Sequence, residues 1–226
     1  MLTPAMEDYL KTIYQLQEQQ GSVSTSKLAE HMKYSAASVT GMMKKLDKLK
    51  MVQYERYRGV RLTHTGQQAA LETLRHHRLL ELFLTDMLGY SWDEVHEEAD
   101  RLEHHISEKL EARIFEALGR PTHDPHGDPI PTLSGEMPRS TLELHPLTAL
   151  KPNDTGIIAR VLTQDDEILR YLHKQGLGLN AEVQILYDTP IAGTLTLWVE
   201  GKDQVTMSRK IGKLVMLLKV EGEEKK

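Results

Sequence analysis

The order of predicted helices and strands in residues 1–63 restricts the fold more than any other feature of the chain. Residues 6–20 have the apolar spacing of an amphipathic helix, and residues 24–32 predict a shorter helix that a serine or threonine can cap. A longer helix with regularly spaced apolar residues is predicted over residues 35–50. Residues 51–63 alternate and are rich in β-forming residues around Gly59, which predicts a β-hairpin. This order is typical of a winged helix-turn-helix.

The middle of the chain is predicted to be helical and to carry much apolar surface. The helical pattern runs from residue 65 to about residue 118 and is broken near residues 89–91. Its apolar residues form two stripes: Leu79, Leu80, Leu82, Phe83, Leu84, Met87 and Leu88, and then Leu102, Ile106, Leu110, Ile114 and Leu118. Because one helix packed on a small head would not hide this surface, we expect a homodimer interface here.

A proline-rich segment separates this helical region from a β-rich C-terminal part. Residues 121–146 contain six of the nine prolines, which predicts a linker or an extended arm. Beyond it, one helix is predicted over residues 165–174 among four short β-like runs. The runs cover residues 156–162, 182–187, 194–199 and 205–207. Short strands at this spacing predict a small barrel, so the chain is expected to be mainly α-helical with small β parts.

Composition and charge narrow the class of protein. The chain has no cysteine, which excludes disulfides and thiolate metal ligands. It also lacks a signal peptide and any apolar run of about 20 residues, so we expect a cytoplasmic protein that does not bind a membrane. The net charge of −5 is uneven, with +4 on residues 1–70, −9 on residues 71–145 and none beyond. A basic head before an acidic middle suits an anion-binding part joined to a cation-binding part.

Histidines and carboxylates in the acidic middle carry the strongest chemical signal. Their spacing places two imidazoles and two carboxylates on one helix face: His96, Asp100, Glu103 and His104. A preceding helix adds His77 and Glu81, four residues apart. A divalent cation relieves the repulsion between such carboxylates, and ligation by nitrogen and oxygen without sulfur suits Mn²⁺, Fe²⁺, Co²⁺, Ni²⁺ or Zn²⁺. The alternative is a solvated acidic helix with incidental histidines. Three neighbours without such spacing are expected at the surface: His76, Glu98 and His105.

Eight segments in the first 135 residues or so carry a family resemblance. They are residues 6–14 (MEDYLKTIY), 28–30 (LAE), 38–40 (SVT), 57–59 (YRG), 62–63 (LT), 75–81 (RHHRLLE), 92–107 (WDEVHEEADRLEHHIS) and 127–131 (GDPIP). In this order they resemble the diphtheria toxin repressor family of metal-dependent regulators, which includes the manganese transport regulators. The resemblance implies four parts: a winged helix-turn-helix in 1–66, a helical dimerisation and metal-binding domain in 67–120, a proline-rich linker in 121–147, and an SH3-like (FeoA-like) barrel in 148–226.

The resemblance also implies two metal sites in each subunit. A primary site would use Asp8 from the first helix together with Asp100, Glu103 and His104. A second site would use His77, Glu81 and His96. In the longer members the barrel adds polar ligands to the second site, and four residues are candidates for this: Gln164, Asp165, Asp166 and Glu167. The alternative for each of these four is a polar helix start.

The chain departs from both branches of the family at its primary site. Asp8 and Asp100 stand where the iron-sensing members have methionine and cysteine, so the site offers only oxygen and nitrogen ligands. Lys11 stands where the short manganese regulators have a second carboxylate on the first helix, so their closely paired metal site is not expected here. We therefore expect Mn²⁺ or Fe²⁺ as the activating metal.

The DNA-binding residues are expected on the third helix and the hairpin. By position in the family, five residues would face the major groove: Ser35, Ala37, Ser38, Thr40 and Gly41. Six basic side chains would neutralise phosphates: Lys27, Lys44, Lys45, Lys48, Arg58 and Arg61. Because serine and threonine discriminate bases poorly, recognition is expected to depend on DNA shape and methyl contacts. For each lysine the alternative is a solvated helix face.

These features predict a transcriptional repressor of metal-uptake genes that binds double-stranded DNA as a metal-loaded homodimer and is not an enzyme. One alternative is a metal-dependent hydrolase that uses the histidine and carboxylate cluster, which would need an open coordination position and a general base. Another is a winged-helix regulator that senses a small organic ligand. Only the first hypothesis couples metal binding to DNA affinity without turnover.

Overall fold

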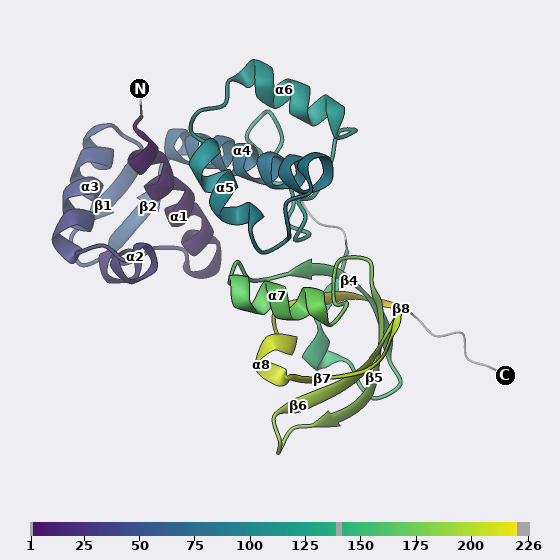
Figure 1. The fold of residues 1–226 in the computed structure, drawn as a ribbon. Helices are drawn as coiled ribbons and strands as arrows, with labels where there is room; N and C mark the ends of the chain where they lie inside the picture. Colours follow the sequence, from purple (N-terminus) through teal and green to yellow (C-terminus); the bar gives the residue numbers. More distant parts are fainter. Residues whose placement is uncertain (1, 139–141, 221–226) are drawn as a thin grey trace. The chain divides into compact units, whose positions relative to one another are not determined.

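The structure is a computed structural model that describes residues 2–138 and 142–220 (Figure 1). The chain forms two compact units whose segments alternate along the sequence. The first unit comprises Met1–Leu79, Asp100–Arg113 and Ile130–Pro138. The second unit comprises Leu80–Ala99, Ile114–Pro129 and Arg139–Lys226.

The first unit begins with the predicted winged helix-turn-helix. Its elements are α1 (Pro4–Gln20), α2 (Thr25–Met32), α3 (Ala36–Lys48), β1 (Val52–Glu55) and β2 (Gly59–Leu62) (Figure 1). The predicted caps are confirmed, because the Ser24 hydroxyl accepts a hydrogen bond from the Lys27 amide and the Ser35 hydroxyl accepts one from the Ser38 amide. The third helix ends at Lys48, two residues earlier than predicted.

The hairpin of this unit pairs in antiparallel register and packs against the helices. Val52 lies opposite Leu62, and Val60 forms an isolated bridge with Val23. Gly59 has a φ of 95°, and a Cβ there would press on the Val23 carbonyl, so this turn favours glycine. The core of the unit is apolar and comes from these three helices, both strands and residues 70–74 of the next helix, for example through Leu10, Leu28, Met43, Val52 and Val60.

The middle of the chain is helical, as the sequence predicts, but it forms three helices where one predicted break implied two. They are α4 (His64–Leu88), α5 (Val95–Leu102) and α6 (Glu108–Ala117). The predicted break at residues 89–91 is confirmed, and a second break at residues 103–107 was not predicted. The boundary between the two units falls within α4 and within α5. No helix in the described part of the chain combines the length and the apolar character that a membrane crossing needs.

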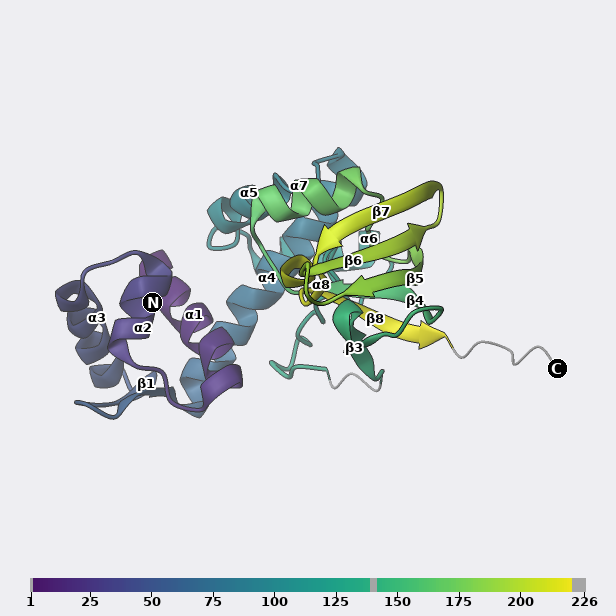
Figure 2. The same cartoon turned by 90° about the horizontal axis from the view of Figure 1, so that it is seen from below.

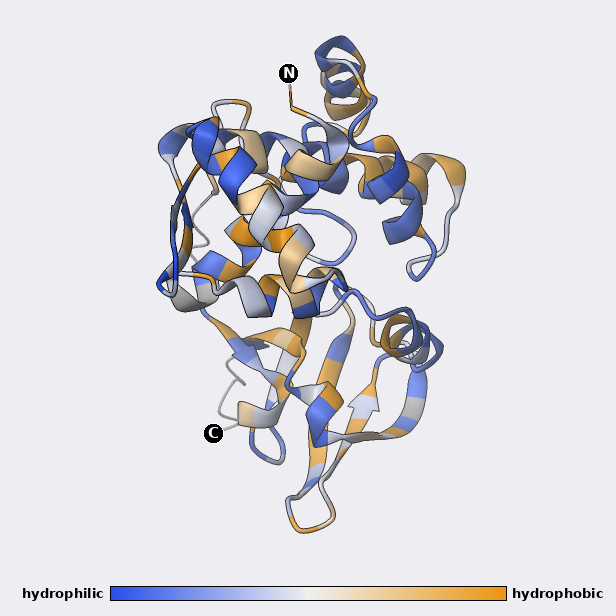
Figure 3. Cartoon of the chain, turned by 90° about the vertical axis from the view of Figure 1, so that its left-hand side faces the viewer, coloured by the Kyte–Doolittle hydropathy of each residue, from blue (hydrophilic) through white to orange (hydrophobic). Residues whose placement is uncertain are grey.

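The second unit contains a small antiparallel barrel with strand order β3-β8-β4-β5-β6-β7 (Figure 2). Its strands are β3 (Leu144–Pro146), β4 (Thr155–Val161), β5 (Glu182–Thr189), β6 (Thr194–Val199), β7 (Lys202–Ser208) and β8 (Val215–Val220). Three short helices join them: η1 (Leu147–Ala149), α7 (Asp166–Lys174) and α8 (Arg209–Gly212). Hydrophobic and hydrophilic residues alternate along the strands (Figure 3), and in β6 every second residue is buried. The sequence predicted four of the six strands and missed β3 and β8.

The proline-rich segment has irregular backbone, as a linker would, but much of it is packed. Asp124 and His126 are buried in the second unit. There the His126 carbonyl accepts a hydrogen bond from the Val161 amide of β4. Gly127 has a φ of 83°, and a Cβ there would overlap the Ala159 carbonyl. In the first unit the Pro131 carbonyl accepts a hydrogen bond from Arg75 on α4. Residues 121–129 of this segment therefore belong to the second unit, and residues 130–138 belong to the first. Residues 139–141 lie outside the described residues.

Candidate metal centre

A histidine and two carboxylates come together in the first unit. Asp8 lies on α1, and Glu103 and His104 directly follow α5. Each of the three offers one ligand atom, and these atoms all lie within 4.8 Å of one another. The Nε2 atom of His104 is 2.8 Å from Asp8 Oδ1 and 3.4 Å from Glu103 Oε1. The predicted primary set is thus assembled at these three positions, with a donor set of oxygen and nitrogen that fits a divalent cation.

Glu7 is part of this group and was not predicted. Its Oε2 atom lies 2.7 Å from His104 Nδ1, so Glu7 and Asp8 contact opposite nitrogens of one imidazole. A carboxylate at the outer nitrogen fixes the orientation of a metal-binding histidine. The contact could not be found from spacing, because 97 residues separate Glu7 from His104. The position of Glu7 next to Asp8 was the only feature of the sequence that pointed to it.

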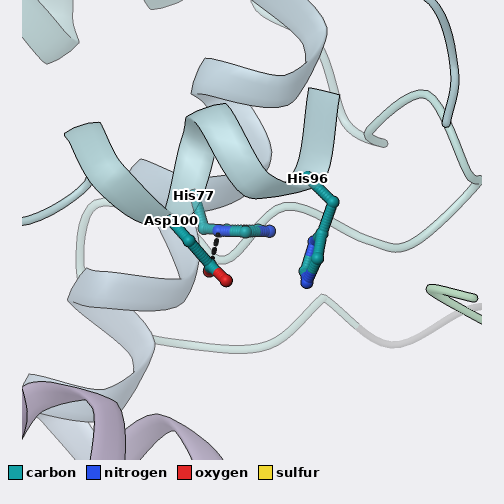
Figure 4. A group of neighbouring side chains, drawn as sticks. All are labelled: His77, His96 and Asp100. Carbon is teal, nitrogen blue, oxygen red and sulfur yellow. Dashed lines mark ion pairs between the residues drawn. The ribbon is translucent and has the colours of Figure 1, made fainter. Parts of the chain in front are cut away.

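Asp100, the fourth member of the predicted primary set, contacts different partners. Its Oδ1 atom lies 2.9 Å from Lys11 Nζ and 3.2 Å from His77 Nδ1 (Figure 4). Glu103 contacts the same two residues. Its Oε1 is 2.6 Å from Lys11 Nζ, and its Oε2 is 2.6 Å from His77 Nδ1. His96 lies one turn before Asp100 on α5 and projects from the same face of that helix (Figure 4).

Burial changes the proton affinity of two groups on α1. Burial raises the pKa of Asp8 above its usual value, and the opposing charges of His104 and Lys11 do not cancel this. Burial alone would lower the pKa of the Lys11 ammonium, but the carboxylates of Glu103 and Asp100 outweigh it and raise that pKa. Lys11 therefore stays charged among the carboxylates at neutral pH.

Glu81 is the centre of a second group, which lies in the second unit. Its Oε1 atom lies 3.0 Å from His96 Nδ1, which brings together two residues of the predicted second set. The third, His77, is one turn before Glu81 on α4. Glu81 also forms a fully buried group with Asp124 and His126, whose ligand atoms lie within 4.8 Å of one another. Asp124 and His126 were missed because the proline-rich sequence around them predicted a linker.

The buried group of the second unit is closed by an aromatic ring. His126 stacks on Trp92 at a ring distance of 5.4 Å, and its Nε2 lies 3.3 Å from the Trp92 carbonyl oxygen. The Trp92 indole donates a hydrogen bond to the Pro125 carbonyl and packs in the apolar core of the barrel. The charge and hydrogen bonding of Glu81 raise the pKa of His126, although burial alone would lower it.

His76, Glu98 and His105 were predicted to lie at the surface, and for His76 this prediction was wrong. His105 is exposed and Glu98 is half-buried, but His76 is largely buried and has two partners. Its Nδ1 lies 3.1 Å from the Glu103 carbonyl oxygen, and its Nε2 lies 3.2 Å from Glu111 Oε2. The spacing argument failed because it considered only metal ligands, whereas His76 faces the helix α6 that carries Glu111.

The four candidate ligands of the barrel lie at the start of α7. Asp165 caps α7, where its side chain accepts hydrogen bonds from the amides of Glu167 and Ile168. Gln164 is exposed and Asp166 is half-buried. Within residues 2–138 and 142–220, no group of possible metal ligands includes any of these four predicted positions. Their geometry is that of the polar helix start given as the alternative.

The predicted DNA-facing residues lie on α2, α3 and the wing of the first unit. Most are exposed, whereas Lys27 and Thr40 are half-buried: Lys27, Ser35, Ala37, Ser38, Thr40, Gly41, Lys44, Lys45, Lys48, Arg58 and Arg61. A surface hollow of about 640 Å³ lies between the start of α2, α3 and the hairpin. Thr40, Lys44, Arg56 and Arg58 are among the residues that line it. Cations around a concave surface suit a phosphate backbone.

Comparison with known families divides the chain in three. Residues 1–60 match the family described as iron dependent repressor, N-terminal DNA binding domain. Residues 63–132 match the family described as iron dependent repressor, metal binding and dimerisation domain. Residues 145–218 match the FeoA domain family.

Several known proteins match this chain over nearly its whole length. The iron-dependent repressor IdeR of Mycobacterium leprae is 32% identical over 97% of this chain and 99% of its own length. Among solved structures, a manganese-dependent transcriptional repressor in complex with manganese is 38% identical, with a TM-score of 0.84 over 95% of this chain and 100% of the other. The manganese regulator SloR is 32% identical, with a TM-score of 0.75 over 97% of this chain and 100% of the other.

Proposed function

This chain belongs to the iron-dependent repressor family of metal-dependent, DNA-binding transcriptional regulators, and on this premise we propose that it represses metal-uptake genes as a metal-loaded homodimer. The matched families are repressor domains and a FeoA domain, so the hydrolase alternative is not favoured.

The contact between Asp8 and His104 carries the proposal. Asp8 lies on α1 of the DNA-binding head, and His104 follows α5, yet their side chains are 2.8 Å apart. A divalent cation bound by Asp8, Glu103 and His104 would crosslink these two segments. Asp100 is proposed as a further ligand that gives up its contacts with Lys11 and His77. Tying α1 to α5 restricts the position of the recognition helix, and this restriction couples metal binding to operator binding.

A second ion is proposed at Glu81. His77, Glu81 and His96 are the residues implied by the family resemblance, and the contact between Glu81 and His96 supports them. The buried Asp124 and His126 offer further ligand atoms, and His126 Nδ1 lies 3.8 Å from Glu81 Oε2, the carboxylate oxygen other than the one that contacts His96. Glu81, Asp124 and His126 all belong to the second unit, where the His126 carbonyl also accepts a hydrogen bond from β4. This ion would therefore stabilise the second unit rather than hold the DNA-binding head.

Mn²⁺ is proposed as the preferred metal, with Fe²⁺ close behind. The primary group offers carboxylate oxygens and one imidazole without sulfur, and hard ligands of this kind suit Mn²⁺ better than thiolate or thioether sites do. Zn²⁺ binds such ligands tightly but usually takes only four of them. Relatives named for iron and for manganese both match the chain over most of its length.

For DNA, α3 is proposed to enter the major groove, with the wing on the adjacent phosphates. Ser35 and Ser38 share a hydrogen bond at the start of α3, and Gly41 follows them on the same helix without a side chain. This part of the helix therefore offers the groove only small polar groups and backbone. Lys44, Lys45 and Lys48 follow on the same helix and would neutralise phosphates. In a homodimer the two recognition helices would match half-sites about 34 Å apart or a multiple of that distance.

The test is operator affinity at buffered concentrations of free metal. A duplex selected from a random pool in the presence of Mn²⁺ serves as the operator, and binding is measured with Mn²⁺, Fe²⁺, Co²⁺ and Zn²⁺. Wild type should respond first to Mn²⁺, Asp8→Met should shift the response toward Fe²⁺, and Asp86→Met should change nothing, because Asp86 is an exposed residue of α4 outside both groups. A wild type that responds to Fe²⁺ but never to Mn²⁺ would refute the choice of metal. Metal binding without any change in operator affinity would refute the function.

A further inference from the structure

A lysine ammonium lies inside the carboxylate group of the first unit. Lys11 Nζ is 2.6 Å from Glu103 Oε1 and 2.9 Å from Asp100 Oδ1. The Lys11 side chain is only 12% exposed and that of Glu103 is fully buried, whereas Asp100 is 47% exposed. A buried ammonium in contact with two carboxylates replaces the water that each would otherwise bind, so these contacts are strong and sensitive to the loss of either charge.

Lys11 and Asp8 reach the same carboxylate from one helix. They are three residues apart on α1 and therefore lie on one face of it. The Oε1 atom of Glu103 is 2.6 Å from Lys11 Nζ and 3.4 Å from His104 Nε2, and His104 in turn contacts Asp8. A cation bound by Asp8, Glu103 and His104 would thus approach the oxygen that Lys11 already holds. Two positive charges cannot share one buried oxygen without repulsion.

We propose that Lys11 is a resident counter-cation, which competes with the divalent cation for Glu103 and Asp100 and so sets the metal concentration at which the primary site fills. The proposal rests on the proposed function, because it assumes that Asp8, Glu103 and His104 hold the metal. In the metal-free chain Lys11 links α1 to the end of α5 through its two ion pairs. When the site fills, Lys11 gives up at least one carboxylate, so part of the metal-binding free energy is spent on displacing it. Lys11 is therefore a residue that sets affinity, and it is not itself a ligand.

Two substitutions of Lys11 should change metal affinity in opposite directions. Lys11→Met removes the charge and keeps an unbranched side chain that suits a helix, so Mn²⁺ should bind about tenfold more tightly or better. Lys11→Arg keeps the charge and can bind a carboxylate through two parallel hydrogen bonds, so Mn²⁺ should bind several-fold more weakly. Lys109→Met is the matched control, because Lys109 is an exposed lysine on α6 outside the group.

The experiment titrates the full-length protein with Mn²⁺ against a competing chelator and follows the binding event that His104→Ala abolishes. Thermal unfolding provides a second measurement. Without metal, Lys11→Met should melt below wild type because it leaves two carboxylates without their ammonium, and Mn²⁺ should raise its Tm by more than it raises that of wild type. A mere packing defect would weaken binding in both Lys11 variants and would not give opposite signs.

The outcomes separate this proposal from the proposed function. If wild type shows no Mn²⁺ binding that depends on His104, the metal site itself is wrong. If that binding is present but Lys11→Met binds no more tightly, or Lys11→Arg binds no more weakly, Lys11 does not compete and only this inference is overturned. Where Lys11→Met does not fold without metal, Lys11→Arg decides the question by the same criterion.

Discussion

The two groups of histidine and carboxylate side chains contain the same residue types but differ in their surroundings. In the first unit, Asp8 comes from a helix of the DNA-binding head and is partly exposed, and Lys11 supplies a positive charge among the carboxylates. In the second unit, Glu81, Asp124 and His126 are all buried, and His126 stacks on the ring of Trp92. The first group is therefore suited to respond to metal, and the second is suited to hold a unit together.

The difference follows from the sequence distance that each group spans. His104 contacts Glu7 and Asp8 across 97 and 96 residues, so the first group joins the start of the chain to its middle. His126 and Trp92 are 34 residues apart and stack beside the barrel core within one unit. Breaking contacts at the first group should change DNA binding, whereas breaking contacts at the second should change stability.

The largest expected effect is on the stability of the second unit. Trp92→Ala removes a buried indole from the barrel core and its hydrogen bond to Pro125, so it should lower the free energy of unfolding by about 3–5 kcal/mol. Urea unfolding followed by far-ultraviolet circular dichroism, which needs neither of the two tryptophans, measures this. Trp198→Ala, at a position 39% exposed, is the control and should cost about 1 kcal/mol or less. Equal losses would show that Trp92 does not close the second group.

A pair of histidine substitutions should separate the metal dependence of operator binding from the stability of the fold. His104→Ala should abolish the metal dependence of operator binding, a loss on the order of 100-fold in the coupling of metal to DNA. His126→Ala should reduce that coupling less than about tenfold but should lower the Tm, because it leaves Glu81 buried beside a cavity. Fluorescence anisotropy with a labelled operator, with and without Mn²⁺, ranks the two. If His126→Ala removes the metal response and His104→Ala does not, the roles of the two groups are reversed.

Local sequence patterns predicted most of the fold for a physical reason. The caps at Ser24 and Ser35 and the breaks after α1 and α4 depend on a few neighbouring residues, so they could be found from spacing alone. β3 was missed because it is three residues long and ends in a proline. It is a strand only because Leu144 pairs with Leu218 of β8, far along the chain. Such pairing is a tertiary contact that no local pattern contains.

For the candidate site, too, local patterns could predict only what lies within a single helix. Helical spacing predicted that His77 and Glu81 share one face of α4, which the helix confirms. It also predicted that His96, Asp100, Glu103 and His104 share one helix face, and this was wrong for Glu103 and His104, because α5 ends at Leu102. It could not show that Lys11 bridges Asp100 and Glu103, or that Glu7 bonds to His104, because these contacts join separate helices. It also could not show that an Asp and a His between prolines are buried beside Glu81.

A smaller effect is expected from the outer partner of His104. Glu7→Ala removes the carboxylate at His104 Nδ1 and should weaken Mn²⁺ binding by about tenfold, because an unoriented imidazole must be ordered when metal binds. Glu18→Ala is the control on the same helix, since Glu18 bonds to Tyr14 and lies outside the group. Titration with Mn²⁺ against a chelator measures the change. Equal affinity in Glu7→Ala and wild type would exclude this orienting role.

The smallest expected effect is a pH dependence of stability at His76. Burial alone would lower the pKa of His76, but the hydrogen bond and charge of Glu111 outweigh it and raise the pKa above the usual value for histidine. The geometry agrees, because both nitrogens face acceptors, the Glu103 carbonyl and the Glu111 carboxylate, and only the protonated ring can donate to both. A raised pKa in the folded state gives stability that is complete below the pKa of the unfolded chain and is lost as the pH rises through the folded value.

His76→Gln should therefore cost roughly 1 kcal/mol near pH 6 and less near pH 9, because glutamine keeps one donor and cannot be protonated. Urea unfolding at the two pH values, with a chelator present to exclude metal, measures the difference. His105→Gln is the control, since His105 is exposed and directly follows His104 in the same loop. A cost for His76→Gln that is constant with pH would mean that the neutral ring already makes both contacts. A cost that grows with pH would mean that the sign of the shift is wrong. The dependence on pH, rather than the size of the loss, distinguishes a charged link between Glu103 and Glu111 from a histidine that only fills space.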